Sequence, residues 1–310
     1  MKITGPIAVY GAAGFVGINL LNSLLKVRSD VIGLSSEPEK SWRIKANKIT
    51  KANLAKCDLL DIKDIKKTLT KYKPQTIFNL AAYGAYSKQK DIKKIYETNF
   101  ISTVNLIEEL KKHSFKVYIH AGSQSEYGLN SGGPAEEGEL VPNSHYALSK
   151  TAVYYLLKYY GKIERLPVIH ARLYSAYGPW EEADRLMPVL VENLKKGRLP
   201  DFVDPDISRD FIYIEDVISA LLVLAAKIKT EHYGEAFNLC TGKKTTIKEL
   251  AYLAKKLFKI KALPKFGAMQ NRAWDVKGWY GNPKKMQKTF GWRTKISLKE
   301  GLLRFYNHEK

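Results

Sequence analysis

The sequence predicts an α/β chain in which helices cover both faces of a parallel β-sheet. Short apolar runs with strand character alternate with helix-period segments over roughly the first 170 residues, and parallel strands need helical crossovers of this kind. A glycine-rich turn joins the first predicted strand to the first predicted helix. The 310 residues are 45% hydrophobic and 26% charged, which is the balance of a globular chain that can bury a large core.

The predicted elements of the first half are separated by Gly, Pro and charged residues. Apolar runs predict strands at 6–10, 31–34, 76–80, 117–121 and 167–171. Leucine, isoleucine and other apolar residues at helical spacing predict helices at 18–26, 62–72, 92–112 and 146–160.

The second half of the chain has a different pattern. Prolines from Pro179 to Pro205 interrupt the alternation that ends near Leu173. We therefore expect a first domain over 1–174 and a smaller lobe over 175–310, with segments near 210–240 returning to the first domain. Helices are predicted in this part at 189–196, 217–226, 246–258 and 297–306, with a strand at 236–239.

The composition limits the classes of partner. A net charge of +20 suits nucleic-acid or membrane-surface binding, or a polyanionic small ligand. The lysines are dispersed over the polar sides of the predicted helices, without an arginine-rich tail, so we expect neither a nucleic-acid nor a membrane partner. No apolar run reaches the roughly 20 residues of a membrane span. Two distant cysteines, Cys57 and Cys240, form no disulfide framework, and we expect a cytoplasmic protein.

Three glycines, Gly11, Gly14 and Gly17, lie between the first predicted strand and the first predicted helix, with Phe15 and Val16 among them. A glycine turn that ends a strand and opens a helix is an anion cradle, because its N–H groups and the helix dipole face a pyrophosphate. The alternative is simply tight packing of the strand on the helix. We favour the cradle, which predicts a Rossmann-type, doubly wound fold that binds a dinucleotide.

The end of the second predicted strand indicates which dinucleotide binds. A Rossmann fingerprint usually has an acid there for the ribose 2′-hydroxyl, whereas this chain has Ser35, with Arg43 further on. A hydroxyl and a cation fit a 2′-phosphate, so NADP is favoured over NAD; alternatively, Ser35 is a loop residue and either cofactor is accepted. Asp58 and Leu59 follow the third strand-like stretch and could contact the adenine, or Asp58 could cap a helix.

A tyrosine and a lysine, Tyr146 and Lys150, lie four positions apart on one face of a predicted helix. Such a tyrosine can exchange a proton with a hydroxyl or carbonyl while hydride moves, and a nearby ammonium is expected to lower its pKa toward neutrality. The spacing alone is weak, because it occurs six times in this chain. The preceding loop and Ser123, which ends a predicted strand, select this pair. The alternative for Ser123 is an ordinary polar turn.

Six features occur along the chain in a fixed order: the glycine turn at 11–17, Asn79-Leu80-Ala81-Ala82, Asn99, Ser123 before Tyr127-Gly128, Tyr146-x-x-x-Lys150, and Ser-Arg-Asp-Phe-Ile-Tyr at 208–213. Together they resemble the extended short-chain dehydrogenase/reductase family of NAD(P)-dependent nucleotide-sugar epimerases and dehydratases. The resemblance runs nearly end to end. It implies that Tyr146 is the acid/base, that Lys150 binds the nicotinamide ribose, and that Ser123 hydrogen-bonds the reacting sugar oxygen, usually at C4.

The resemblance also assigns binding residues by position. It places Ala81, Ala82 and Asn99 against the cofactor. It places Arg209 and, more loosely, Arg272 on the substrate pyrophosphate, with surface ion pairs as the alternative. Gln124 and Ser175 fall at substrate-contact positions, although family members commonly have Asn where this chain has Ser175.

One departure from the family narrows the reaction. Family 4,6-dehydratases carry an acid one or two positions after the catalytic serine or threonine, and here those positions are Gln124 and Ser125. Glu126 comes one position late and points to the opposite side if the segment is extended. We therefore disfavour dehydration.

The sequence thus predicts a metal-free enzyme that binds NADP or NAD and a nucleotide-linked sugar, and that transfers hydride at a sugar carbon, with C4 favoured. Reduction by a 4-ketoreductase and 4-epimerisation use the same Ser123, Tyr146 and Lys150. The missing acid at Ser35 favours reduction, whereas epimerisation is common among proteins of this pattern. A 4,6-dehydratase and a non-catalytic dinucleotide-binding relative are the alternatives. The resemblance further implies polysaccharide biosynthesis and a homodimer formed through the helix at 146–160 and the long helix before it.

Overall fold

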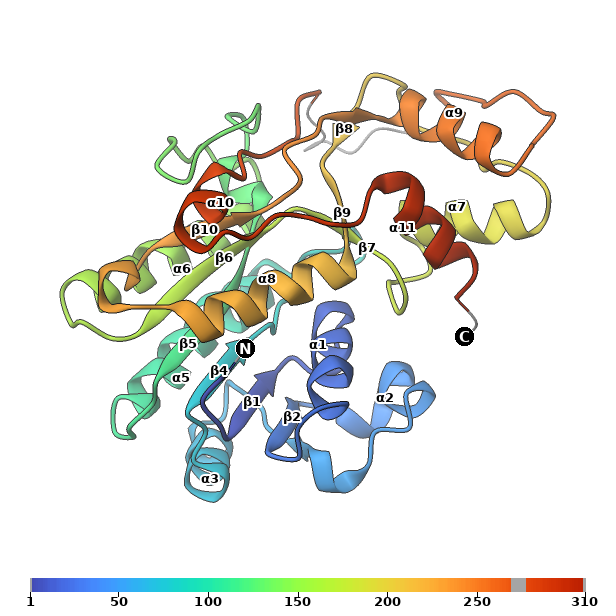
Figure 1. The fold of residues 1–310 in the computed structure, drawn as a ribbon. Helices are drawn as coiled ribbons and strands as arrows, with labels where there is room; N and C mark the ends of the chain where they lie inside the picture. The colour runs from blue at the N-terminus through green and yellow to red at the C-terminus, as the bar shows by residue number, and fades with distance from the viewer. Residues whose placement is uncertain (1, 269–276, 309–310) are drawn as a thin grey trace.

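A seven-stranded parallel sheet forms the centre of the protein in the computed structural model, which describes residues 2–268 and 277–308. The strand order is β10-β6-β5-β4-β1-β2-β3, and every neighbouring pair is parallel. This confirms the predicted α/β fold with a doubly wound sheet (Figure 1). The strands are β1 (Ile7–Tyr10), β2 (Val31–Ser35), β3 (Leu54–Lys56), β4 (Thr76–Asn79), β5 (Val117–Ser123), β6 (Val168–Leu173) and β10 (Ala236–Leu239).

The order of the strands fixes where a ligand can bind. The chain winds outward from β1 through β2 to β3, and then returns to the other side of β1 as β4. The loops that follow β1 and β4 therefore leave the sheet in opposite directions. In open parallel sheets, a crevice for ligands forms at this reversal, outside the carboxyl ends of the strands.

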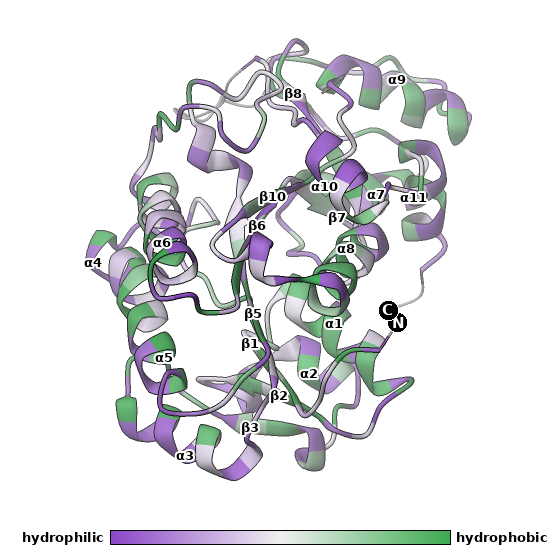
Figure 2. Cartoon of the chain, turned by 60° about the vertical axis from the view of Figure 1, so that its left-hand side comes forward, coloured by the Kyte–Doolittle hydropathy of each residue, from purple (hydrophilic) through white to green (hydrophobic). Residues whose placement is uncertain are grey.

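Helices cover both faces of the sheet, with their apolar sides inward (Figure 2). On one face, α3, α5 and α6 pack together, and on the other α1 and α8 lie side by side. The predicted helix at 62–72 is confirmed residue for residue, and the others in this half differ at their ends. The bounds are α1 (Phe15–Leu25), α2 (Trp42–Ala46), α3 (Ile62–Tyr72), α5 (Ser102–Leu110), α6 (His145–Lys162) and α8 (Ile214–Lys227).

The long helix predicted at 92–112 is not regular. It consists of α4 (Ile92–Tyr96), a π-helical turn η3 (Glu97–Ile101) and α5. A π-turn adds backbone between two α-helical stretches, and such turns often occur at functional positions. Here the turn contains the buried Asn99, so this predicted cofactor residue lies where the helix changes its winding.

The part of the chain after Leu173 supplies smaller elements above the sheet (Figure 1). Two short sheets form there, in which β7 pairs with β9 and β11 pairs with β8. Strand β10 joins the central sheet beside β6, although the division into two domains at residue 174 stays a prediction. The bounds are β7 (Ser175–Tyr177), α7 (Leu186–Lys195), β8 (Ser208–Arg209), β9 (Phe211–Tyr213), β11 (Thr245–Thr246), α9 (Ile247–Leu257), α10 (Lys284–Phe290) and α11 (Leu298–Tyr306).

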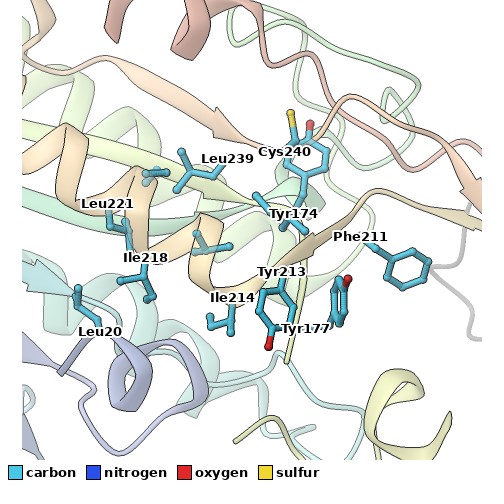
Figure 3. Packing of buried hydrophobic residues seen from close by; sticks show 14 of the residues in the cluster. Leu20, Tyr174, Tyr177, Phe211, Tyr213, Ile214, Ile218, Leu221, Leu239 and Cys240 are labelled. Atoms are coloured by element: carbon cyan, nitrogen blue, oxygen red, sulfur yellow. The ribbon is translucent and has the colours of Figure 1, made fainter. Parts of the chain in front are cut away.

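Helix α8 ties this part of the chain to the sheet. Ile214, Ile218 and Leu221 lie along one side of the helix, and Figure 3 shows Leu20 of α1 nearby. All four side chains belong to one buried apolar cluster, each at most 5% exposed. Burying a side chain of this size stabilises a fold by about 1.5–3 kcal/mol. The apolar run at 217–226 is therefore a core helix.

Candidate active site

The glycine turn lies between β1 and α1, as predicted. Gly11 has a φ of +76°, and a Cβ there would lie 2.6 Å from the Ala81 nitrogen. A Cβ on the buried Gly17 would lie 2.1 Å from the Gly11 carbonyl oxygen, so both positions need glycine for the chain's own packing. Gly14 differs, because its φ of −78° suits any residue and a Cβ would meet only the Gly11 oxygen, at 3.2 Å. Packing alone does not explain glycine at this exposed position.

The residues predicted to read the cofactor ribose lie at the end of β2 and in α2. Ser35 is the last residue of β2 and is half-buried. Arg43 is 5% exposed, and its guanidinium is already engaged: Nε donates to the Trp180 oxygen at 2.6 Å, and Nη2 lies 3.1 Å from Glu182. A 2′-phosphate at this position would compete with a carboxylate for the arginine.

Asp58 and Leu59 lie in the loop between β3 and α3. Asp58 accepts a hydrogen bond from the Leu60 N–H at 2.9 Å, which makes a local turn. The N-cap of α3 is Asp61, whose side chain accepts from the Lys63 N–H, so the helix-cap alternative for Asp58 is wrong. Leu59 is buried.

Asn99 holds the loop after β4 in place. Its side-chain nitrogen donates to the Tyr83 carbonyl and to the Ser149 hydroxyl, both at 2.8 Å, and its oxygen accepts from the Tyr83 N–H at 2.9 Å. Ala81 and Ala82 belong to the same loop, directly after β4. The amide of Asn99 is thus occupied by the protein, and its direct effect is on the position of this loop.

The three predicted catalytic residues converge at the carboxyl end of β5. Ser123 is the last residue of β5, and its hydroxyl accepts from the Ser125 hydroxyl at 2.8 Å. Tyr146 lies in the first turn of α6, within hydrogen-bonding reach of Ser123. Lys150 is one turn further along, 1% exposed, and its Nζ donates to the Ala121 carbonyl at 2.9 Å.

The protonation states of this group follow mainly from burial. Burial raises the pKa of Tyr146 to about 12, and the hydrogen bond with Ser123 opposes that rise. The prediction that the nearby ammonium brings this pKa toward neutrality is therefore wrong for the protein alone, because desolvation of the phenolate is the larger effect. Burial lowers the pKa of Lys150 to about 8, while Glu126 raises it. At neutral pH, Tyr146 is a phenol that can donate a proton.

The predicted substrate residues fall into two places. The Gln124 side-chain nitrogen donates to the Ser175 hydroxyl at 3.1 Å, beside Ser123. The Gln124 side-chain oxygen is buried and has no partner among residues 2–268 and 277–308. Arg209, in β8, lies 4.5 Å from the Trp279 ring, in a different part of the molecule. Arg272 lies outside the described residues.

Glu126 does not face the reacting side of the site. The segment after Ser123 is not extended but a 3-10 turn, η4 (Gln124–Tyr127), so the argument from strand alternation does not apply. The outcome is nevertheless a carboxylate behind the site: it accepts the Ser123 N–H at 2.7 Å and pairs with Arg172. Neither Gln124 nor Ser125 is an acid in this turn.

The sequence analysis missed two groups near Tyr146. The charges of Tyr86 and Arg185 both act on the pKa of Tyr146, which places them close to its hydroxyl. Arg185 Nε also lies 3.5 Å from Glu181, whose pKa burial raises to about 7. Nothing in the local sequence singles these residues out, because they come from loops that only the fold brings to α6.

Two further properties concern ligands and membranes. In the described part of the chain, no group of three or more His, Cys, Asp and Glu side chains is arranged to hold a metal ion. No helix in residues 2–268 or 277–308 is long and apolar enough to cross a bilayer. Both findings concern only what the structure describes.

A parallel sheet with this strand order, the glycine turn and the Ser123, Tyr146 and Lys150 group define the extended short-chain dehydrogenase/reductase class. A model of the NAD dependent epimerase/dehydratase family matches residues 7–240, so the chain belongs to that family. UDP-glucose 4-epimerase of Mycolicibacterium smegmatis is 28% identical over 303 residues, covering 95% of each chain.

Two solved structures are similar over almost the whole chain. UDP-glucuronic acid 4-epimerase from Bacillus cereus, in complex with UDP-glucuronic acid and NAD, is 25% identical with a TM-score of 0.83, covering 97% of this chain and 98% of that one. dTDP-glucose 4,6-dehydratase from Bacillus anthracis, in complex with NAD, is 26% identical with a TM-score of 0.83, covering 97% and 94%. Relatives of this chain are thus NAD-dependent nucleotide-sugar 4-epimerases and 4,6-dehydratases.

Proposed function

We propose that the protein transfers hydride at C4 of a nucleotide-linked sugar, as a 4-ketoreductase or a 4-epimerase, with Tyr146 as the acid/base. The observation that carries this proposal is the convergence of Ser123, Tyr146 and Lys150 at the carboxyl end of β5. The Gln124 oxygen beside them is a buried acceptor that a sugar hydroxyl would satisfy.

The residues present fit a nicotinamide dinucleotide. Glycine at Gly14 is unexplained by packing and is explained by a pyrophosphate that approaches the backbone closely at the start of α1. In this arrangement Lys150 holds the ribose beside Tyr146. The bound dinucleotide supplies or accepts the hydride.

The two reactions differ in what Tyr146 does first. In a reductase, its phenol donates a proton to the C4 oxygen as hydride reaches C4, and the pKa of about 12 suits this donor role. In an epimerase, Tyr146 first takes the proton of the C4 hydroxyl, the 4-keto sugar turns over, and the proton returns. Ser123 donates a hydrogen bond to the C4 oxygen in both.

The cofactor preference is tested separately. The engagement of Arg43 with Glu182 supports NAD, whereas Ser35 at the end of β2 supports NADP. Freshly purified protein would be denatured, and the released nucleotide identified by mass spectrometry. NAD(H) near one per subunit supports a recycled cofactor and epimerisation. NADP(H), or a site that binds NADPH more tightly than NADH, supports the reductase and the preference predicted from Ser35.

The assembly and location are further proposals. Three residues of α6, Leu148, Tyr155 and Tyr159, are 46%, 56% and 51% exposed, and Ile92 and Ile101 of the neighbouring helix are 49% and 44% exposed. We expect a second copy of the chain to cover this apolar surface in a homodimer, which light scattering would test. The free, buried thiols of Cys57 and Cys240 support a reducing, cytoplasmic location.

The role of Tyr146 is tested by Tyr146→Phe, with Tyr252→Phe, on an exposed part of α9, as the matched control. Activity would be followed with UDP-glucose, UDP-glucuronic acid and 4-keto nucleotide sugars. We expect Tyr146→Phe to lose turnover while NADH affinity, measured by fluorescence, stays nearly unchanged. Turnover that survives in Tyr146→Phe contradicts the mechanism. A wild-type protein that binds NADH but converts none of these sugars supports the non-catalytic alternative.

A further inference from the structure

Four ionisable side chains lie buried behind Ser123 and Lys150, on the side of the sheet strands away from the glycine turn's loop. They are His120 of β5, Glu126 of η4, and His170 and Arg172 of β6, each at most 1% exposed. Charged residues are almost never fully buried unless they are paired. A cluster of this kind, directly beneath a proposed active site, needs a physical reason.

Glu126 is the centre of this cluster. Its Oε2 lies 2.6 Å from Arg172 Nε, and its Oε1 lies 2.8 Å from His170 Nε2. The same Oε1 accepts the Ser123 N–H at 2.7 Å, while the Ser123 hydroxyl accepts the Ser125 N–H at 3.2 Å. Ser123 and Glu126 thereby form a reciprocal capping box that fixes the turn. The carboxylate thus determines where the Ser123 hydroxyl points.

Arg172 is held as firmly as its partner. Its Nη1 donates to the Tyr127 hydroxyl at 2.8 Å and to the Glu136 carbonyl at 2.9 Å. Its guanidinium lies over the rings of Tyr127 and Tyr154, at 4.6 Å and 4.4 Å from their centroids. An arginine fixed by two rings and two acceptors keeps the Glu126 carboxylate in one orientation.

The two histidines extend the cluster to Lys150. The rings of His120 and His170 are stacked, with centroids 5.6 Å apart and planes 6° apart. His120 Nε2 lies 3.4 Å from Lys150 Nζ, which is hydrogen-bonding distance. Burial lowers the pKa of both histidines, so both are neutral, and a neutral Nε2 can accept a proton from the ammonium. Lys150 is therefore held by His120 and by the Ala121 carbonyl.

The sequence of β5 shows that space is reserved for this contact. A Cβ on Gly122 would lie 2.2 Å from His170 Nε2 and 2.7 Å from Glu126 Oε1. Real Cβ atoms do not approach so closely, so a strand that is otherwise well suited to β-branched residues has glycine here. The approach of the two side chains is thus built into the strand immediately before Ser123.

We propose that Glu126 is a positioning residue of the reaction, which orients Ser123 through its N–H and keeps Lys150 charged from behind the site. This inference rests on the proposed function. The electrostatics support the geometry, because Glu126 raises the pKa of Lys150 against its burial. The other groups that face Lys150, His120 and His170, are neutral. Glu126 is then the nearby charge that favours an ammonium able to bind the ribose.

The test measures the titration of Lys150 directly, in the full-length protein. With selectively 13C-labelled lysine, the Lys150 resonance would be assigned by its loss in Lys150→Met, and its midpoint followed by NMR. Wild-type protein should titrate near pH 8. We expect Glu126→Gln to lower this midpoint by roughly one pH unit, because it removes one nearby negative charge and keeps the side-chain shape.

Two variants keep the result interpretable. Glu126→Gln leaves Arg172 without its buried partner, so Glu126→Gln/Arg172→Met removes both charges and is expected to show the same lowered midpoint. Glu109→Gln is the matched control, because Glu109 is also buried (7% exposed) and paired, with Lys112 at 2.7 Å, but lies on α5. It should leave the Lys150 midpoint unchanged. An unchanged midpoint in both Glu126 variants overturns the proposal.

Kinetics separate this inference from the proposed function. With whichever probe sugar the wild type converts, Glu126→Gln should lower kcat roughly tenfold or more and change KM little, since orientation at the reacting atom is lost. Equal losses in kcat and in folded fraction, with an unmoved midpoint, would show that Glu126 is only structural. A protein inactive with every sugar contradicts the proposed function, while the titration still decides whether Glu126 acts on Lys150.

Discussion

Asp210 connects three separate segments around the predicted pyrophosphate residue, and its removal gives a quantitative test. Its carboxylate is fully buried and accepts four hydrogen bonds: the Thr241 N–H at 2.9 Å, the Thr241 hydroxyl at 2.6 Å, the Gly242 N–H at 2.9 Å and the Gly281 N–H at 3.2 Å. At about 1 kcal/mol net for each, Asp210→Ala should cost about 4 kcal/mol. That is a large fraction of the 5–15 kcal/mol by which proteins are usually stable.

The measurement is urea unfolding, followed by circular dichroism and fluorescence. We expect the midpoint to fall while the slope with denaturant is unchanged, since the same surface is exposed on unfolding. Asp206→Ala, an exposed acid four residues away, should change the unfolding free energy by less than about 0.5 kcal/mol. Asp210→Asn keeps one acceptor but turns an NH2 group toward donors, so it should recover less than half of the loss.

The functional consequence follows from the neighbouring residue. Arg209 precedes Asp210, and the loops that Asp210 anchors include Gly281, two residues after Trp279, on whose ring the Arg209 guanidinium lies. Folded Asp210→Ala should therefore bind UDP more weakly, as measured by calorimetry. A stability loss below about 1 kcal/mol would refute the reasoning, because four hydrogen bonds to one buried carboxylate would then be worth almost nothing.

Three further outcomes are expected. Lys150 titrates near pH 8 when folded and near 10.5 when unfolded, so folding releases its proton between these values; the unfolding free energy of wild type relative to Lys150→Met should rise by roughly 3 kcal/mol from pH 8 to 10.5, measured by urea titration. Gly14→Ala should keep the wild-type melting temperature but lose NADH affinity roughly tenfold by fluorescence titration. Asn99→Ala removes three hydrogen bonds, to Tyr83 and Ser149, and should lower the unfolding free energy by about 3 kcal/mol in urea.

Local patterns were sufficient to predict the sheet and most of its helices. The run at 76–80 and the amphipathic segment at 62–72 correspond to β4 and α3 because one side of each segment is apolar and must be buried. Short elements such as α2 and α10 were not predicted, since five to seven residues give too little periodicity. The π-turn in the helix at 92–112 was also missed, because its cause is the long-range contact of Asn99 with Ser149.

The candidate site divides in the same way. Gly11, Ser123, Tyr146 and Lys150 carry motifs, and the structure places them at the end of the sheet strands expected from those motifs. Arg43 could not be predicted correctly from sequence, because its partner Glu182 is far away in the chain. Similarly, the effect of burial on the pKa of Tyr146 depends on desolvation, and a sequence shows the neighbouring lysine but not the depth of the pocket.

The π-turn at η3 makes this region sensitive to changes in chain length. Before the turn, α4 packs against α6, which carries Tyr146, and after it α5 packs against α3 on the sheet. Each α-helical residue turns the helix by about 100°, so deleting one residue from Glu97–Ile101 would rotate one half relative to the other by about that angle. Either the anchor of the loop after β4 or the core face of α5 would then turn toward solvent. Related chains should therefore tolerate substitutions on the exposed side of this helix but not a single-residue deletion within it.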